Sequence, residues 1–213
     1  VEINQIGSSA GIKDAINGTV EIGMSSRDLK EEEIAEGLVE VEVAFDGMAV
    51  ITSKNNKIDS LKLSDVKDIY TGKITNWKDV GGEDSQIVVV SREDGSGTRD
   101  AFQEIVGYTS EELYKESIIG DGSGNIKTTV AGNNHAIGFI SFEYIDDSVN
   151  AVKIDDIAPI AENVKSGEYK LSRPFLLVYK EENLKENGNK LIDFILSKEG
   201  QNIVEESGLI RIN

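Results

Sequence analysis

The sequence of 213 residues contains no cysteine, one histidine, one tryptophan and two prolines. Without cysteine, the chain can form neither disulfides nor thiolate metal sites. The single histidine, His135, leaves no zinc cluster and no relay that would activate a serine nucleophile. We interpret His135 as a surface or packing residue rather than a general base, and we expect no bound metal, no cofactor and no enzymatic activity.

Long apolar runs and basic charge are also scarce. No stretch approaches the roughly 18 to 20 consecutive apolar residues of a membrane-spanning helix, and the opening VEINQIGSSAG shows no export signal, which is either absent or removed. The 39 acidic residues outnumber the 22 basic ones, which gives a net charge of −17. This charge repels nucleic acids, so we expect no nucleic-acid partner. A local anion site stays possible, because salt screens distant charges over about 8 Å.

Strand-like and helix-like segments alternate along the chain. Strands are expected at residues 1–7, 19–25, 38–45, 48–54, 86–90, 136–142 and 174–180. Helices are expected at residues 9–18, 98–107, 110–117, 126–132 and 187–197, and after Ser64, which can cap a helix with apolar Val66, Ile69 and Tyr70. The alternation predicts an α/β fold. We expect a first lobe of residues 1–50 with 173–213 and a second of residues 51–172, with a glycine-rich turn at 120–125 and a returning linker near 155–170.

The stretch SREDGSGTRD, residues 91–100, carries the clearest signal of a binding site. It joins an expected strand to an expected helix, and a helix start leaves several backbone N–H groups aimed at one point. Ser96 and Thr98 add hydroxyl donors, glycines let the backbone approach a ligand, and Arg92 offers a planar fork that matches an oxyanion. The simplest alternative is a capped helix behind a glycine turn, but Arg92 and the strand–loop–helix context favour an oxyanion site.

Two further junctions carry hydroxyl side chains. The stretch QIGSSAGIKD places Ser8 and Ser9 in front of a helix, and GMSSRDL ends a strand with Ser25 and Ser26. Open α/β sheets bind ligands at the carboxyl ends of their strands. Each junction alone is typical of helix capping, but their occurrence in two halves of the chain indicates a ligand cleft.

Other motif interpretations fail at individual positions. The sequence DGSGT lacks the ending of a nucleotide-binding P-loop and does not match the G-x-S-x-G of a hydrolase. The sequence DGSGNI at residues 121–126 resembles the start of a calcium loop, but Ile126 stands where glycine is needed and Gly132 where glutamate should chelate. We therefore expect no calcium site.

Four stretches occur in the order of a known family: GSSAGIKDAINGTVEIGMSSRDLK, LSDVKDIYTGKITNWKDVGG, SREDGSGTRDAF and NHAIGFISFEYI. With these and the closing GQNIVEESGLI, nearly the whole chain resembles the substrate-binding proteins of ABC-type phosphate uptake systems. The resemblance implies a two-lobed periplasmic-binding-protein-like (type II) fold, whose lobes close about a hinge on a dehydrated phosphate in the cleft between them. The implied phosphate-binding residues are Ser8, Ser26, Arg92, Ser96, Gly97 and Thr98, with Ser9 and Asp94 in supporting positions.

Two departures from the family bear on function. Ser26 stands where some members carry an aspartate that accepts the proton of hydrogen phosphate, a role that a hydroxyl can also take. Asp94 could supply the carboxylate instead, but we expect it to orient Arg92 through an ion pair, and we expect Arg99 to face water. The family's N-terminal strand, phosphate loop and helix are missing, so we expect tight binding to need an N-terminal segment from another chain, or the chain to self-associate.

The resemblance implies an extracytoplasmic protein, lipid-anchored through a segment absent from this sequence, that binds inorganic phosphate and delivers it to the membrane permease of an ABC importer. One alternative is a receptor for another oxyanion, such as sulfate or molybdate. Another is a serine hydrolase that uses Ser96 as its nucleophile, for which the sequence offers no convincing base.

Overall fold

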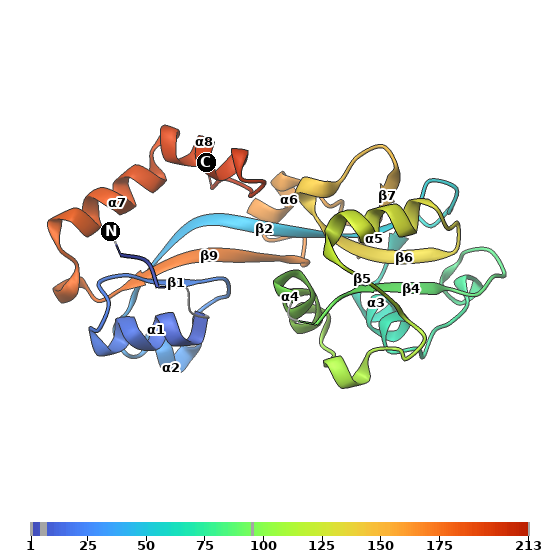
Figure 1. Cartoon of the computed structure of the whole chain (residues 1–213), viewed down its shortest axis with the longest axis horizontal. Coiled ribbons are helices and arrows are strands. Elements are labelled where there is room, and N and C mark those ends of the chain that lie inside the picture. The colour runs from blue at the N-terminus through green and yellow to red at the C-terminus, as the bar shows by residue number, and fades with distance from the viewer. Residues whose placement is uncertain (1, 5–7, 95, 213) are drawn as a thin grey trace. The chain divides into compact units, whose positions relative to one another are not determined.

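The computed structural model describes residues 2–4, 8–94 and 96–212. The chain divides into two compact units, unit 1 with residues 1–46 and 173–213 and unit 2 with residues 47–172 (Figure 1). The chain therefore crosses from unit 1 to unit 2 once and returns once. The lobes predicted from the sequence, with boundaries good to a few residues, placed these crossings near residues 50 and 172.

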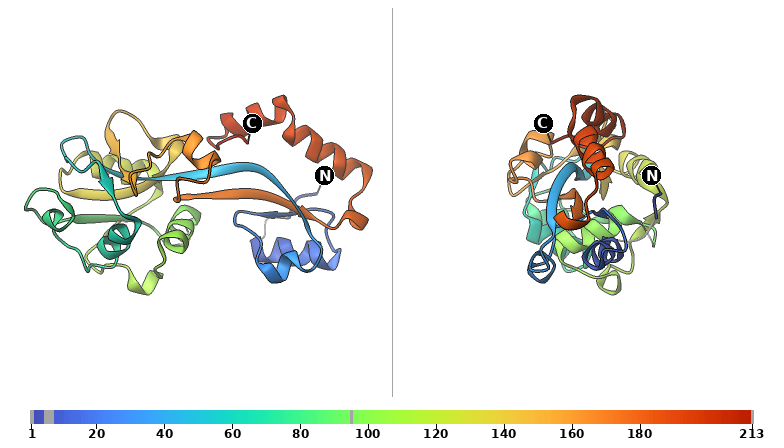
Figure 2. Two further views of the ribbon diagram at one scale, coloured as in Figure 1. Left: turned by 180° about the vertical axis from the view of Figure 1, so that it is seen from behind. Right: turned by 90° about the vertical axis from the view of Figure 1, so that its left-hand side faces the viewer.

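Unit 1 is built on a sheet in which β9 lies between β1 and β2. The helix α1 packs on this sheet through Ile12 and Ala15, which contact Leu176 and Val178 of β9. The helices α7 and α8 lie on the other side of the sheet, as Figure 1 and the left view of Figure 2 show. The elements of unit 1 are α1 (Ser8–Asn17), β1 (Gly23–Ser25), α2 (Glu31–Ile34), the first part of β2 (Val39–Ser53), β9 (Ser172–Tyr179), the 3-10 turn η4 (Glu181–Asn183), α7 (Glu186–Leu196) and α8 (Lys198–Glu206).

Two glycines allow α1 to approach β1 closely. A Cβ atom on Gly23 would clash with the carbonyl oxygen of Gly11, and a Cβ atom on Gly11 would lie 3.1 Å from the carbonyl oxygen of Met24. The helix ends at Gly18, whose φ of +69° favours glycine. The start of α1 and the end of β1, which carry the predicted serines, therefore lie side by side.

Unit 2 has helices on both faces of a sheet with the strand order β2-β6-β4-β5, in which β7 also pairs with β2. Successive residues of β6 point to opposite faces of the sheet. Ile140 packs in one cluster with Ile126 of α5. On the other face the ring of Phe139 stacks on that of Phe102 in α4, with 4.0 Å between the ring centroids. The elements of unit 2 are the end of β2, β3 (Ser60–Leu61), α3 (Leu63–Tyr70), η1 (Trp77–Val80), β4 (Val88–Arg92), α4 (Gly97–Val106), η2 (Ser110–Glu112), β5 (Ile118–Gly120), α5 (Gly122–Ala131), β6 (Ala136–Ser141), η3 (Phe142–Tyr144), β7 (Val149–Ala151), β8 (Lys153–Ile154) and α6 (Ala161–Lys165).

Several predicted elements differ from the structure. The two strands expected at residues 38–45 and 48–54 are one continuous strand, β2, which runs from one unit into the other. The expected helix at 110–117 is only the short turn η2. The glycine-rich turn at 120–125 instead contains the beginning of α5, because Gly122, with a φ of +75°, opens the helix.

The start of one helix and the first expected strand also differ from the prediction. Ser64 does not cap α3, because the helix begins one residue earlier and Lys62 holds the N-cap position. The apolar positions Val66, Ile69 and Tyr70 are buried as predicted. In the strand expected at residues 1–7, residues 2–4 are not in a strand, and the others lie outside the described residues.

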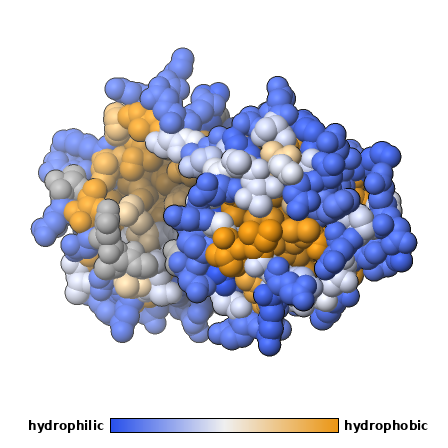
Figure 3. Space-filling view, turned by 45° about the vertical axis from the view of Figure 1, so that its right-hand side comes forward, coloured by the Kyte–Doolittle hydropathy of each residue, from blue (hydrophilic) through white to orange (hydrophobic). Residues whose placement is uncertain are grey.

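Hydrophilic side chains cover much of the face shown in Figure 3, and hydrophobic side chains gather in patches between them. In the part of the chain that the structure describes, no helix has the length and apolar character needed to cross a membrane.

Candidate functional site

The predicted oxyanion loop lies in unit 2 between β4 and α4. The strand β4 ends at Arg92, and α4 begins at Gly97 with Ser96 as its N-cap. The Oγ of Ser96 accepts a hydrogen bond from the backbone N–H of Arg99 at 3.2 Å. The first turn of any α-helix presents N–H groups without partners inside the helix, and in α4 these include the N–H groups of Gly97 and Thr98. Backbone donors and hydroxyls are therefore gathered in one loop.

Arg92 is fixed by contacts on two sides. Its Nε and Nη2 donate to the two carboxylate oxygens of Glu93 at 2.8 and 2.9 Å, and its Nη1 donates to Ser123 Oγ at 3.0 Å. Glu93 also accepts from the backbone N–H of Gly122 at 3.2 Å, which joins the loop to the start of α5. A guanidinium has more N–H groups than these contacts use, so Arg92 can still donate to an anion.

The pairing of Arg92 with Glu93 determines the local charge. The hydrogen bond from Arg92 lowers the pKa of Glu93 to about 2, and the same bond raises the pKa of Arg92. Both groups are therefore charged at neutral pH, and Glu93 offsets much of the positive charge of Arg92. An anion bound at this loop would depend on hydroxyl and backbone donors as well as on Arg92.

Asp94 and Arg99 do not behave as the sequence predicted. Asp94 pairs with Arg99 rather than with Arg92, since its Oδ1 accepts from Arg99 Nη1 at 2.6 Å. Arg99 is 5% exposed, so the expectation that it faces water was wrong. The reason is its position in α4, where Phe102 and Gln103, one turn further on, are also buried and mark the inner face of the helix.

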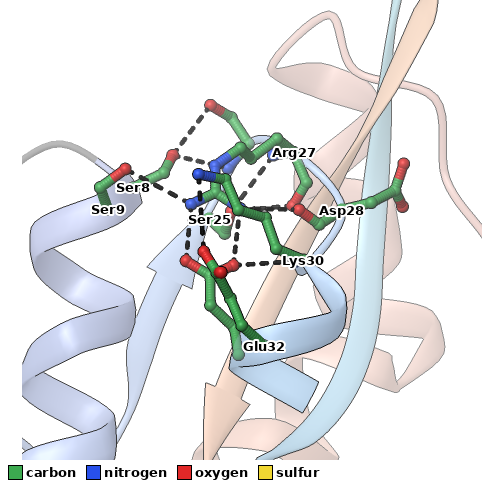
Figure 4. Close-up of polar contacts among 9 residues, drawn as sticks. Ser8, Ser9, Ser25, Arg27, Asp28, Lys30 and Glu32 are labelled. Atoms are coloured by element: carbon green, nitrogen blue, oxygen red, sulfur yellow. Dashed lines mark hydrogen bonds and ion pairs between the residues drawn. The ribbon is translucent and has the colours of Figure 1, made fainter. Parts of the chain in front are cut away.

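The predicted serines of unit 1 meet where β1 ends and α1 begins (Figure 4). The backbone N–H of Ser26 donates to Ser8 Oγ at 3.0 Å, and the two Oγ atoms lie 3.3 Å apart. The hydroxyl of Ser25 contacts the backbone of Arg27 instead, with its Oγ donating to the carbonyl at 2.8 Å. Ser8 and Ser26 therefore form a hydroxyl pair, while Ser25 stabilises the turn.

Arg27, which the sequence analysis did not single out, connects this cluster (Figure 4). Its Nη1 and Nη2 donate to the carboxylate of Glu33 at 2.8 and 2.9 Å, Nη2 to Ser9 Oγ at 3.3 Å, and Nη1 to the carbonyl of Asp28 at 2.8 Å. Glu33 also accepts from the backbone N–H of Lys30 at 2.9 Å. The hydrogen bond from Arg27 lowers the pKa of Glu33 to about 2. In the sequence, the signal that could have identified Arg27 is its position directly after Ser25 and Ser26.

The structure therefore brings the predicted site residues together in two clusters, and their role in ligand binding stays a prediction. The unit 1 cluster contains Ser8, Ser9 and Ser26 with Arg27 and Glu33. The unit 2 cluster contains Arg92, Ser96, Gly97 and Thr98 with Glu93, Asp94, Arg99 and Ser123.

Both His135 and Ser96 make structural contacts. His135 is exposed at the turn before β6, and its carbonyl accepts from Trp77 Nε1 and from the backbone N–H of Val88, both at 2.9 Å. The hydroxyl of Ser96 already caps α4. Among the described residues, no group of three or more histidines and carboxylates could hold a metal ion.

Comparisons with known proteins place the chain in a family. The model of the PBP superfamily domain, PBP-like 2, matches residues 1–199. The phosphate-binding protein PstS of Borreliella burgdorferi is 32% identical over 97% of this chain and 77% of its own length. The protein of the same name from Bacillus subtilis is 37% identical over 79% of this chain, which spans 57% of that relative.

Solved structures agree with this placement. A Clostridium perfringens protein with bound phosphate, described as a phosphate ABC transporter substrate-binding protein, is 66% identical, and the match covers 100% of this chain and 87% of that one with a TM-score of 0.72. An ABC-type phosphate transport receptor from Vibrio cholerae is 35% identical over 96% of this chain and 85% of its own, with a TM-score of 0.90. The chain therefore belongs to the PBP superfamily and, within it, to the PstS-like phosphate-binding proteins.

Proposed function

We propose that this protein binds inorganic phosphate, without chemical conversion, through residues of the two clusters. The observation that carries the proposal is the loop from Arg92 to Thr98, where a fixed guanidinium, capping hydroxyls and the first N–H groups of α4 come together. The 66% identity to a protein crystallised with bound phosphate supports the choice of anion. Backbone and hydroxyl donors suit phosphate because its oxygens accept several hydrogen bonds at once.

Each cluster has a distinct part in this proposal. The loop between β4 and α4 supplies most of the N–H donors and the guanidinium of Arg92. Ser8 and Ser26 supply hydroxyls that can either donate to a phosphate oxygen or accept the proton of hydrogen phosphate. Ser9 and Asp94 do not need to touch the ligand, since their described contacts are with Arg27 and Arg99.

One observation favours a second candidate, a receptor for sulfate or another fully ionised oxyanion. The carboxylates of Glu33 and Glu93 are engaged by arginines, and the unit 1 cluster offers a hydroxyl at Ser26. To distinguish hydrogen phosphate from sulfate, a site must accept the proton of hydrogen phosphate. Among the described contacts of the proposed ligand residues, only hydroxyl groups are left for this role. Sulfate presents no proton, so such a site would discriminate against it weakly.

Titration calorimetry with phosphate, sulfate, molybdate and arsenate, together with an esterase assay, tests this function. Phosphate is expected to bind more tightly than sulfate or molybdate, and no ester is expected to be hydrolysed. Sulfate affinity equal to phosphate affinity at pH 7 would change the assignment to a general oxyanion receptor. Binding of none of the four anions would contradict the proposal.

We further propose that the protein works outside the cytoplasm, held by a lipid anchor, and delivers phosphate to the membrane permease of an ABC importer. The support is the family, whose Clostridium perfringens and Vibrio cholerae members are described as transporter components. Phosphate uptake by proteoliposomes that contain the permease of an ABC-type phosphate importer should require the added protein. Uptake that proceeds equally well without it would refute this role.

A further inference from the structure

Arg99 contacts three points of the loop between β4 and α4. Its Nη1 donates to the carbonyl oxygen of Arg92 at 3.1 Å and to Asp94 at 2.6 Å, while its backbone N–H donates to Ser96 Oγ at 3.2 Å. The first contact holds the end of the strand, the second the middle of the loop and the third the cap of the helix. A single residue therefore contacts both ends of the loop and Asp94 between them.

The burial of this side chain is unusual for an arginine. Its side chain is 6% exposed, whereas the side chain of its partner Asp94 is 92% exposed. The Nε of Arg99 is buried and has no hydrogen-bond partner among the described residues. A buried guanidinium with incomplete hydrogen bonding costs stability, and an apolar side chain would suit this face of α4, which also carries the buried Phe102. This cost indicates that the arginine serves the loop rather than the core.

Arg92 and Arg99 have different carboxylate partners. Asp94 accepts from Arg99, while the bidentate partner of Arg92 is Glu93, which also accepts from the backbone N–H of Gly122 at the start of α5. Release of Asp94 would add a second carboxylate near Arg92 and loosen the cap of α4.

We propose that Arg99 is a positioning residue for the anion site, which holds the loop so that the donors of Ser96, Gly97 and Thr98 converge and keeps Asp94 away from Arg92. This inference rests on the proposed binding of phosphate by the loop. A loop of fixed shape should distinguish oxyanions by size. Arsenate is the suitable probe, because it has the shape and charge of phosphate but longer bonds to oxygen.

The test measures the dissociation constants of phosphate and arsenate by calorimetry for the unchanged protein, Arg99→Met, Arg99→Lys and Asp94→Asn. Arg99→Met is expected to weaken phosphate binding at least about tenfold. The second expected effect is weaker discrimination between the two anions, because a loosened loop fits both. The dissociation constant of arsenate divided by that of phosphate should fall at least about threefold. Arg99→Lys and Asp94→Asn should give smaller changes in the same direction, since each keeps part of the contact.

The ratio separates positioning from stability. A variant that is merely less folded binds both anions more weakly by the same factor, so the ratio does not change. Lys127→Met is the matched control, because it removes an ion pair with Asp146 from α5 in the same unit and should leave both constants unchanged. If Arg99→Met does not fold, Arg99→Lys and Asp94→Asn carry the test.

The outcomes distinguish this inference from the function on which it rests. If the unchanged protein binds phosphate but the Arg99 and Asp94 variants keep both its affinity and its ratio, the inference is wrong and the proposed function stands. If affinity falls while the ratio stays constant, Arg99 only stabilises unit 2 and the inference is again wrong. If the unchanged protein binds neither anion, the proposed function and the inference both fail.

Discussion

Each arginine near the predicted sites is directed by a carboxylate close to it in sequence. The pairs are Arg27 with Glu33, Arg92 with Glu93 and Arg99 with Asp94. In the first two pairs the guanidinium binds the carboxylate through two parallel bonds, and Arg99 binds Asp94 through one. Each pair restrains the side chain and leaves other N–H groups for a ligand or for the backbone. These pairs therefore orient the guanidinium groups, and we expect their removal to affect phosphate binding more than overall stability.

The first residue-scale prediction concerns Arg92. Arg92→Ala removes the only arginine side chain predicted to touch the anion, and loss of one or two charge-assisted hydrogen bonds, about 1.5 to 3 kcal/mol each, should weaken phosphate binding at least tenfold. Arg211→Ala is the control, because Arg211 forms an exposed ion pair with Glu205 in unit 1. Calorimetry that finds equal phosphate affinities for these two variants would rule out the loop as the site.

The second residue-scale prediction concerns pH. The folded protein holds the pKa of Glu33 at about 2, below its ordinary value of 4.5. Because the folded pKa is the lower one, the pair with Arg27 stabilises the fold above pH 4.5, and this contribution is lost as the pH falls from 4.5 towards 2. The difference in unfolding free energy between the unchanged protein and Glu33→Gln should shrink over this range in urea titrations.

Arg27 provides the control for that measurement. In an Arg27→Met background the largest cause of the lowered pKa is gone and the contacts with Lys30 remain, so the effect of Glu33→Gln should depend much less on pH. A pH dependence of unchanged size without Arg27 would show that Arg27 is not the main cause of the lowered pKa of Glu33.

At the scale of elements, the strand–helix pairs were predictable and their connections were not. The helix α1 with its closing Gly18 agrees with the apolar spacing of Ile12, Ala15 and Ile16 in the sequence. The continuity of β2 was hidden, because the sequence around Asp46 and Gly47 is typical of a turn. The strand passes straight through this point, where Asp46 accepts from Arg173 Nη2 at 3.1 Å.

A buried glutamine joins three elements of unit 1. Gln201 of α8 is 1% exposed, and its Nε2 donates to the carbonyls of Val43 in β2 and Ile195 in α7 at 2.9 and 3.0 Å. Its Oε1 accepts from the backbone N–H of Ile212 at 2.9 Å. The side chain therefore satisfies backbone groups of a strand, a helix and the C-terminal segment at once.

Loss of this side chain should destabilise the protein strongly. Gln201→Ala leaves two carbonyls and one N–H unpaired inside unit 1 and is expected to lower the unfolding free energy by about 2 to 4 kcal/mol. Asn202→Ala, at an exposed position of the same helix, should cost less than about 0.5 kcal/mol. Similar urea midpoints for the two variants would show that the buried hydrogen bonds contribute little.

At the scale of the whole molecule, charge opposes the proposed ligand. The net charge of −17 repels a phosphate dianion at long range, while the arginine and backbone donors act only near the loop. Raising the salt concentration shortens the screening length from about 30 Å at 0.01 M to about 8 Å at 0.15 M. We therefore expect the association rate of phosphate to rise with potassium chloride, measured by stopped-flow fluorescence of Trp77 or an attached dye.

An association rate that falls as salt is added would contradict this prediction. A rate that falls with salt would mean that the local field of the arginines outweighs the net charge at the distance where phosphate is captured. The net charge would then be the smaller of the two electrostatic effects on the rate of binding.

The sequence by itself determined the α/β class, the strand and helix around the loop from Arg92 to Thr98, and the proximity of the hydroxyl junctions to strand ends. These follow from local patterns, because hydrophobic period, capping residues and glycine positions act over a few neighbours. The sequence also indicated the family, through the resemblance of several stretches to known proteins.

Only the tertiary structure decided the partners of the arginines. Ser123, which holds Arg92, is distant in sequence, and the burial of Arg99 depends on which face of α4 meets the core. The choice of Glu93 over Asp94 as the partner of Arg92 likewise depends on the start of α5, which supplies the N–H of Gly122. The paired carboxylates lie close to the arginines in sequence, but the choice among them and the contacts of Ser123 and Gly122 depend on elements far apart in the chain, which local sequence patterns do not describe.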